Sequence, residues 1–479
     1  MRDSLRGFLS ELEQIGELIR VKEEVQGEEI FTILWKLFHK HGPAVVFENV
    51  KGHKMPIVAN IFGTIDRYAM ACGFPRGKSA KDYRKMYLDI LDKSELWPKT
   101  QLVNSAPCKE IILRGKEARF SCLPIFKWHP KDGGPYITLP AEIVRDDKLG
   151  TNVGIYRMMI HDDYSSGIMC SVYQHQGIFL RRAMRQGKEK LDCVVALGAN
   201  PAVYVAAVTS IELGKNELEL AGALLGKPLE VVKAETCDIE VPADSEIILE
   251  GEISTTERKK EAPFAEYGGY HEEATVLPVF NLKCITMRKN AMYQITTAGN
   301  EGEILRESPL NAMFVRNLRE RVTGFVDCWL PESGHGYTAI VSVRKYFPGW
   351  GQQAIYQVLS APFVATIVNN VIVVDSDIDP SNLSEWVWAL STRVDPYYDV
   401  IITKPMPVYH LNPAAKGRLG VYDVTGSNEF VVCSKMGIDA TLKTREERPE
   451  RGDILPARPS EEMLSNIERK WAALGLGNI

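Results

Sequence analysis

Two glutamates in one short segment are the first residues whose types and spacing could do chemistry. They stand five residues apart in Glu261-Ala-Pro-Phe-Ala-Glu266. Proline disfavours a helix, and an odd spacing in a regular strand places two side chains on opposite faces, so the segment must bend if both carboxylates serve one site. Such a pair could hold one acid ionised beside a cation and the other as a proton donor near neutral pH. Two ordinary surface acids are the alternative.

A second group of polar residues precedes this segment. Asn152 and Arg157 lie in one predicted strand, His175 at the end of the next, and Glu217 opens a later segment. Amide oxygen, imidazole nitrogen and carboxylate oxygen together suit an ion of the Mn²⁺ or Mg²⁺ type that also holds a phosphate. Arg157 would then neutralise one of the two glutamates. A purely structural role for His175 is the alternative.

The elements that must position these residues fall into three regions. Helical and strand patterns alternate over residues 1–110, short β-branched runs follow over 111–302, and a linking helix at 303–323 leads to a second alternating region at 324–479. We expect strands at 17–21, 44–47, 56–60, 137–145, 152–160, 168–174, 202–210, 229–233, 246–253, 277–296, 338–345 and 370–375. We expect helices at 5–15, 30–41, 80–92, 303–322, 351–366, 382–393 and 461–474.

The last predicted helix has an apolar face of its own. Ser460 is a possible N-cap, and Met463, Ile467, Trp471 and Leu474 share one side of the helix. This face could pack on a neighbouring subunit or on its own chain, and the pattern leaves both open.

Composition narrows the class of protein. The chain has 479 residues, 45% of them hydrophobic and 25% charged, and a net charge of −5. These values are typical of an ordered globular protein and do not favour nucleic acid or a membrane surface as a partner. Nine scattered cysteines without a CxxC pair, and an N-terminus without the apolar core of a signal peptide, predict a cytoplasmic protein.

Several familiar signals fail on inspection. The run Gly222 to Lys227 is one residue too short for a phosphate loop, and the run of aspartates at 375, 377 and 379 has Pro380 where a calcium loop needs glycine. Neither a GxSxG nor a Rossmann fingerprint occurs in the sequence. Nucleotide triphosphate, ordinary hydrolase and nicotinamide chemistry are therefore not expected.

The polar residues match one known family in their order along the chain. The chain resembles the UbiD family of (de)carboxylases over essentially its whole length. The matching features are Asn152-x4-Arg157, Gln174-His175, Glu217, Glu261-x-Pro-Phe-x-Glu266, 231–251, Val371-Ile-Val-Val-Asp375, Thr392-Arg-Val-Asp-Pro396 and Ser434-Lys-Met-Gly-Ile-Asp-Ala-Thr441. Alanines at 262 and 265 replace the glycines usual in this family, so the loop has less backbone freedom here.

This resemblance implies a mixed α/β fold. It consists of a central split β-barrel flavin-binding domain flanked by an N-terminal α/β region and a C-terminal α/β oligomerisation domain. The implied cofactors are prenylated FMN, Mn²⁺ (or Mg²⁺) and K⁺. Loss of CO₂ from an aromatic ring carbon leaves an unstabilised carbanion, so an electrophilic cofactor is chemically necessary. The implied cofactor-binding residues are Asn152, Ile155, Tyr156, Arg157, Gln174, His175 and Glu217, of which Asn152, His175 and Glu217 would hold the metal.

The resemblance also implies roles in catalysis. Glu266 would protonate the carbon that loses CO₂, while Arg157 and Glu261 would hold cofactor and substrate in place. We expect His335, His271 and Phe264 to contact an aromatic, hydroxybenzoate-type acid. A flavin prenyltransferase would supply the cofactor, and a homodimer or homohexamer is typical of the family.

Two other functions remain open from the sequence. The chain could be a non-catalytic subunit of a larger carboxylase, although its intact Arg157, Glu261 and Glu266 argue against this. It could also be a redox protein that uses ordinary FMN. The mass and spectrum of a bound flavin would distinguish the second function from decarboxylation.

Overall fold

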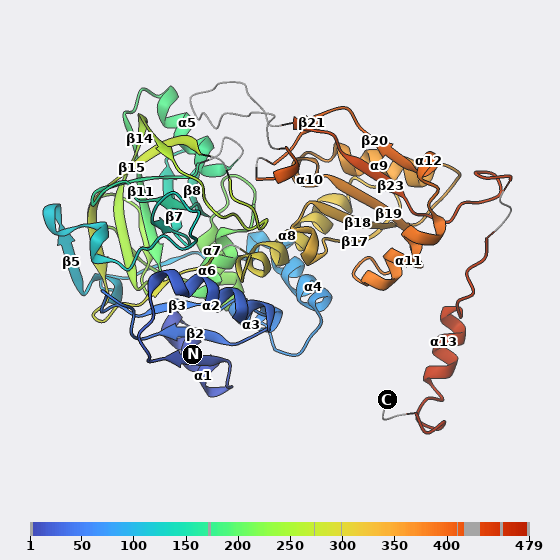
Figure 1. Cartoon of the computed structure of the whole chain (residues 1–479), viewed down its shortest axis with the longest axis horizontal. Helices are drawn as coiled ribbons and strands as arrows, with labels where there is room; N and C mark the ends of the chain where they lie inside the picture. The colour runs from blue at the N-terminus through green and yellow to red at the C-terminus, as the bar shows by residue number, and fades with distance from the viewer. Residues whose placement is uncertain are drawn as a thin grey trace.

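The computed structural model describes residues 3–170, 174–272, 274–297, 299–409, 411–415, 432–450 and 454–476. Figure 1 shows an N-terminal region below a central β-rich region, with a C-terminal region to the side and helix α8 between them. The predicted mixed α/β fold class is confirmed. Among the described residues, no helix is both long and apolar enough to cross a membrane.

The N-terminal region is a small sheet with helices. Its strands run in the order β1-β2-β3-β16, so that β16, from far along the chain, completes it. Ser4 begins the first helix by accepting a hydrogen bond from the backbone N–H of Gly7 at 3.1 Å, as its N-cap position predicts. The elements are α1 (Leu5–Gln14), β1 (Leu18–Val21), α2 (Gly27–His39), β2 (Ala44–Phe47), β3 (Ile57–Ala59), α3 (Ile65–Ala71), α4 (Ala80–Leu91) and β16 (Tyr293–Gln294).

The central region is built on a larger sheet. Its strand order is β10-β15-β14-β11-β7-β8, with β5 pairing to β15. The strands are β5 (Ile111–Arg114), β7 (Ala141–Asp146), β8 (Gly150–Ile155), β10 (Ser165–Gly167), β11 (Lys190–Leu197), β14 (Ile247–Glu261) and β15 (Thr275–Met287). The helices are α5 (His175–Arg185), α6 (Pro201–Ala207) and α7 (Glu217–Leu225). Shorter strands are β4 (Gln101–Leu102), β6 (Tyr136–Ile137), β9 (Met158–Met159), β12 (Glu230–Lys233) and β13 (Glu240–Pro242).

The C-terminal region follows the linking helix and is largely a parallel sheet. Strands β18, β19 and β23 are parallel, while β17 and β20 pair antiparallel at the two edges. The helices are α8 (Gly302–Leu318), α9 (Trp350–Ser360), α10 (Pro362–Ile367), α11 (Leu383–Arg393), α12 (Pro396–Asp399) and α13 (Glu461–Glu468). The strands are β17 (Phe325–Trp329), β18 (Thr338–Val343), β19 (Asn370–Asp375), β20 (Val400–Ile402), β21 (Met406–Pro407), β22 (Val432–Cys433) and β23 (Met436–Asp439).

Several expected elements differ in the structure. The strands expected at 152–160 and 277–296 are each divided, into β8 and β9 and into β15 and β16. The segment expected as a strand at 202–210 is helix α6, because Asn200 caps it and Pro201 occupies its first turn. The helix expected at 351–366 is divided into α9 and α10, since Pro362 cannot continue the first helix. The strand expected at 168–174 does not form at 168–170, and residues 171–173 lie outside the described residues.

Helix α13 stands apart from the rest of the described chain (Figure 1). It is shorter than the helix expected at 461–474, and Ser460 caps it as predicted by accepting a hydrogen bond from the N–H of Met463. Its apolar side chains Met463 and Ile467 are exposed, as are Trp471 and Leu474 in the residues that follow the helix. Among the described residues, therefore, no part of the chain covers this face.

Candidate functional site

A cavity of about 530 Å³ is lined by residues of the central region, helix α8 and the C-terminal region. It is bordered by strand β8, the first residues of helices α5 and α7, the loop after β14, and helices α8 and α10. This volume is in the range of small-molecule and cofactor pockets. The predicted site residues that line it are Asn152, Ile155, Tyr156, Arg157, Gln174, His175, Glu217, Phe264 and Glu266.

We call the part of the cavity lining that Asn152, His175 and Glu217 contribute the Glu217 end. Glu217 is the first residue of α7, a position set by the Asn216 cap, and its carboxylate accepts hydrogen bonds from Asn152 Nδ2 at 2.9 Å and from the N–H of Val153 at 2.8 Å. The Glu217 residue is only 2% exposed. Burial raises its pKa to about 8, although these hydrogen bonds act in the opposite direction.

The same end offers further electron-pair donors. Asn152 Oδ1 is buried and has no hydrogen-bond partner among the described residues. His175 was expected at the end of a strand, but it begins helix α5, where burial lowers its pKa and keeps the imidazole neutral. A neutral imidazole, an amide oxygen and a carboxylate without a counter-charge are donors that fit a bound cation.

A second group of charged residues at the cavity, which we call the Arg157 cluster, consists of three carboxylates around one guanidinium. Arg157 lies between β8 and β9, with its Nε 2.7 Å from Glu261 Oε1 and its Nη2 2.5 Å from Glu272 Oε2. Nη1 donates to Glu266 Oε1. The Arg157 side chain is 6% exposed. Burial acts to lower the pKa of Arg157, but the carboxylates of Glu261 and Glu272 outweigh it, so the pKa is raised and the guanidinium stays charged.

The segment after β14 bends as its sequence requires. Glu261 ends the strand, the N–H of Glu272 donates to the carbonyl of Phe264 at 2.9 Å, and Ala265 forms a β-bridge with His271. We call residues 261–272 the glutamate hairpin. Neither Ala262 nor Ala265 has a positive φ, so the missing glycines do not strain this backbone.

Three expected site residues do not line the cavity. Glu261 lies behind Arg157, which it contacts directly, while His271 lies against Asp132 at an ion-pair distance of 3.4 Å. His335 Nδ1 lies 3.9 Å from a carboxylate oxygen of Glu303 on α8. The structure thus brings Phe264 to the cavity wall and leaves the two histidines outside that lining.

The sequence did not indicate two charged residues that belong to this region. Glu272 completes the Arg157 cluster, and Arg306 of α8 lines the cavity with its guanidinium carbon 4.1 Å from the centre of the Tyr267 ring. No spacing rule marks Glu272, because its approach to Arg157 depends on the fold of the glutamate hairpin. Arg306 is one of several polar residues in a helical pattern, and it belongs to no sequence motif that would indicate a functional role.

Comparison with known proteins gives the same family for every region. The N-terminal, Rift-related and C-terminal domain models of 3-octaprenyl-4-hydroxybenzoate carboxy-lyase match residues 9–86, 100–301 and 305–440. A protein of Synechocystis sp. (strain ATCC 27184 / PCC 6803 / Kazusa) is 32% identical, over 100% of this chain and 97% of its own length.

Solved structures agree with these matches. The chain of the UbiD-class enzyme HmfF from Pelotomaculum thermopropionicum, in complex with FMN, is 33% identical with a TM-score of 0.80, covering 94% of this chain and 97% of that one. An evolved dimeric form of the same enzyme contains prFMN. The closed form of vanillic acid decarboxylase from Sedimentibacter hydroxybenzoicus is 31% identical with a TM-score of 0.86, covering 98% of both chains. The chain therefore belongs to the UbiD family and is a carboxy-lyase of the UbiD type.

Proposed function

We propose that this enzyme catalyses the reversible, non-oxidative decarboxylation of an aromatic, hydroxybenzoate-type carboxylic acid with prenylated FMN as its cofactor. The observation that carries the proposal is that one cavity is lined both by an acid paired with a cation, Glu266, and by a buried carboxylate without a cation, Glu217. The similar vanillic acid decarboxylase and the prFMN complex of HmfF support the substrate class and the cofactor.

The Glu217 end would hold a Mn²⁺ or Mg²⁺ ion and, through it, the phosphate of the flavin. Asn152, His175 and Glu217 supply the donors, and a bound cation would keep Glu217 ionised despite its burial. When bound, the prenylated flavin supplies the electrophile that accepts the electron pair of the carbon–carboxylate bond. The protein must then orient the substrate and deliver one proton.

The Arg157 cluster would perform these two tasks. Arg157 attracts the substrate carboxylate, and Glu261 holds the guanidinium in position from behind the cavity wall. The arriving substrate adds a negative charge to a cluster that already has three carboxylates around one cation, which favours protonation of one of them. Glu266 lines the cavity whereas Glu261 does not, so Glu266 is the acid positioned to give its proton to the carbon that loses CO₂. No net oxidation occurs.

A decarboxylation screen tests the proposed function. The chain is co-expressed with a flavin prenyltransferase, purified, and offered a panel of hydroxylated and methoxylated benzoic acids, with CO₂ release and ring-proton NMR as readouts. We expect turnover of at least one acid, which is lost when the prenyltransferase is omitted. An enzyme that binds unmodified FMN and shows a redox spectrum without CO₂ release would contradict the proposal.

We also propose that the enzyme is at least a homodimer. The exposed apolar residues of α13 support this, because contiguous exposed apolar side chains typically mark a surface that binds another protein. An evolved form of the similar enzyme HmfF is dimeric. Light scattering of the full chain and of a variant with Met463→Glu and Ile467→Glu would test this assembly. A monomeric full chain would contradict it.

A further inference from the structure

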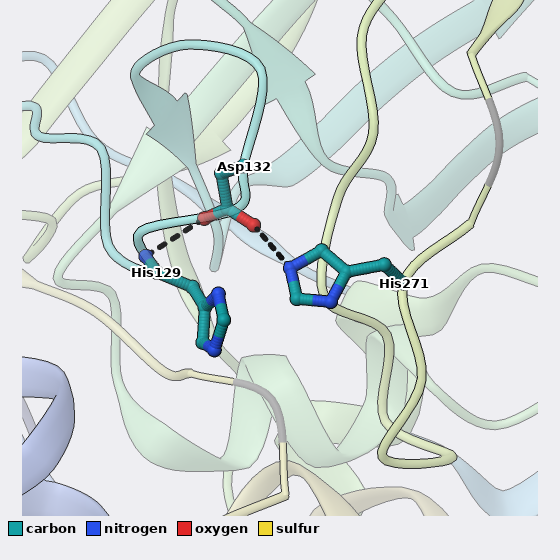
Figure 2. A group of neighbouring side chains, drawn as sticks. All are labelled: His129, Asp132 and His271. Atoms are coloured by element: carbon teal, nitrogen blue, oxygen red, sulfur yellow. Dashed lines mark hydrogen bonds and ion pairs between the residues drawn. The ribbon is translucent and has the colours of Figure 1, made fainter.

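Two histidines and an aspartate meet outside the cavity lining. His129 and Asp132 belong to the segment before β6, and His271 belongs to the glutamate hairpin (Figure 2). One candidate ligand atom from each residue lies within 4.8 Å of the others. The centres of the two imidazole rings are 4.4 Å apart, and Figure 2 shows both rings beside the Asp132 carboxylate. Residues 142 positions apart in sequence thus converge on one point.

The separation of His271 Nε2 and Asp132 Oδ1 fits a shared metal ion better than a direct hydrogen bond. His271 Nε2 lies 3.4 Å from Asp132 Oδ1. This is longer than the roughly 2.7–3.2 Å of an ordinary N–H···O bond. Two ligands about 2.0–2.1 Å from a tetrahedral Zn²⁺ ion are separated by about 3.4 Å. The two atoms therefore stand at the separation that one shared ion imposes.

Asp132 is already held in place by backbone groups. Its side chain is 1% exposed, its Oδ1 accepts a hydrogen bond from the N–H of Ala265 at 3.0 Å, and its Oδ2 accepts one from the N–H of His129 at 2.9 Å. Hydrogen bonds of this kind orient metal-ligating carboxylates in proteins. The carboxylate keeps further lone pairs for a cation.

His129 offers a ring nitrogen as a further ligand at this point. The N–H of Lys131 donates to His129 Nδ1 at 3.0 Å, so that nitrogen carries its lone pair. A metal ion would replace this N–H as the partner of Nδ1, which requires only a local movement of the exposed residue Lys131.

We propose that His129, Asp132 and His271 form a second metal site that binds a divalent ion of the Zn²⁺ class. Two imidazole nitrogens and one carboxylate favour a borderline transition-metal ion over Mg²⁺ or Ca²⁺, which prefer oxygen. A water molecule would complete four-coordination. The site is distinct from the oxygen-rich Glu217 end, which has only one nitrogen ligand.

The proposed metal site lies between the glutamate hairpin and the 129–133 segment, and this position indicates a structural role. Asp132 holds Ala265, the neighbour of Glu266, and His271 is the neighbour of Glu272. The N–H of Gly133 also donates to the carbonyl of Pro263 at 2.8 Å, so the 129–133 segment is the support on which the glutamate hairpin rests. An ion bridging His129, Asp132 and His271 would add a cross-link between hairpin and support, and so would position Glu266 and Glu272 around Arg157.

Metal titration of the full chain tests the proposal. The experiment uses metal-free protein carrying Glu217→Gln, so that the Glu217 end is weakened, and measures Zn²⁺ binding by calorimetry and Co²⁺ binding by visible absorbance. We expect one equivalent of Zn²⁺ and the intense absorption typical of four-coordinate Co²⁺. Adding His129→Ala or His271→Ala should each weaken Zn²⁺ binding at least about 10-fold.

Two controls separate ligation from loss of structure. His39→Ala removes an exposed histidine of α2 and should leave Zn²⁺ binding unchanged. His271→Cys should retain Zn²⁺ binding, because a thiolate is also a zinc ligand, whereas His271→Ala should not. Circular dichroism confirms that each variant is folded. Absence of Zn²⁺ binding, or binding that persists in either alanine variant, would overturn the proposal.

Discussion

The Glu217 end and the Arg157 cluster differ in whether the chain provides a cation beside their carboxylates. In the Arg157 cluster, three glutamates share a cation that the chain itself provides. At the Glu217 end, among the described residues, Glu217 forms no ion pair, and burial raises its pKa to about 8. The chain thus supplies the counter-charge in the Arg157 cluster, whereas at the Glu217 end an ion from solution would have to supply it.

This difference separates two tasks that carboxylates can perform. A carboxylate beside an internal cation is held in place, and its proton affinity changes when a charged substrate arrives. A buried carboxylate without a cation gains most from binding an ion from solution, because that ion removes the cost of burying its charge. The comparison therefore assigns proton transfer to the Arg157 cluster and ion binding to the Glu217 end, and each assignment can be tested separately.

The largest expected effect is that of Glu266→Gln. The amide keeps the shape of the side chain but has no proton to transfer, so we expect a rate loss of about 10²–10⁴-fold. Flavin and metal content should be unchanged, because the Glu217 end is intact. The same variant should fail to exchange the ring hydrogen of the decarboxylated product with solvent deuterium. Glu257→Gln, at an exposed acid of β14, is the matched control; deuterium exchange at the wild-type rate in Glu266→Gln would assign the proton to another group.

Arg157→Ala should remove both turnover and stability. It leaves Glu261, which is 1% exposed, without its cation, and breaking a buried ion pair typically costs about 3–5 kcal/mol. Unpaired buried carboxylates have raised pKa values, so the folded variant binds more protons than the unfolded one and recovers stability as the pH falls. Urea unfolding at neutral and mildly acidic pH measures this. Equal destabilisation at both pH values would mean that charge is not the cause.

Glu217→Ala and His175→Ala should act on binding. Both variants should stay folded but lose metal and most of the flavin, with affinity falling at least about 10–100-fold. Metal analysis and flavin absorbance of purified protein give the result. Glu219→Ala, two residues further along α7 and paired with exposed Lys99, should keep both ligands. Normal occupancy in the first two variants would show that they are structural residues.

Glu272→Gln should reduce turnover less than Glu266→Gln or Arg157→Ala does. Arg157 keeps its contacts with Glu261 and Glu266, and the amide oxygen can still accept a hydrogen bond from Nη2. We expect turnover to fall by about tenfold or less, equal to about 1.4 kcal/mol. Steady-state kinetics of Glu272→Gln and Glu266→Gln, measured side by side, compares their turnover. An equal loss in both variants would make Glu272 a second candidate for the proton donor.

The smallest expected effect concerns Glu303, a partly buried carboxylate that does not line the cavity. Burial and the charge of Glu332 raise its pKa to about 7. Between about pH 4.5 and 7 the folded state therefore binds more protons at this group than the unfolded state does, and stability falls as the pH rises. Glu303→Gln should remove this part of the pH dependence without changing metal content. Urea unfolding of both proteins across this range provides the measurement, and parallel curves would contradict the expected contribution.

Local patterns predicted much of the fold. Some elements can be predicted from local sequence alone, because capping and side-chain periodicity act within a few residues. Examples are the Ser4 cap, the apolar spacing of α4 and the apolar run of β19. Helix α6 was misread as a strand because its residues are buried on all sides, and a fully apolar run has no periodicity to distinguish the two. Strand β11, which is buried along most of its length, was missed altogether.

The sequence by itself determined the identities and order of the principal site residues, since Asn152, Arg157, Glu217, Glu261 and Glu266 carry the resemblance to the family. Only the tertiary structure decided their neighbours. Glu272 reaches Arg157 across 115 residues, and His271 reaches Asp132 across 139. Such contacts depend on how β14, β15 and the supporting segment are held together in space. Because the energy of those contacts comes from packing and charge between distant segments, no spacing along the chain could have indicated them.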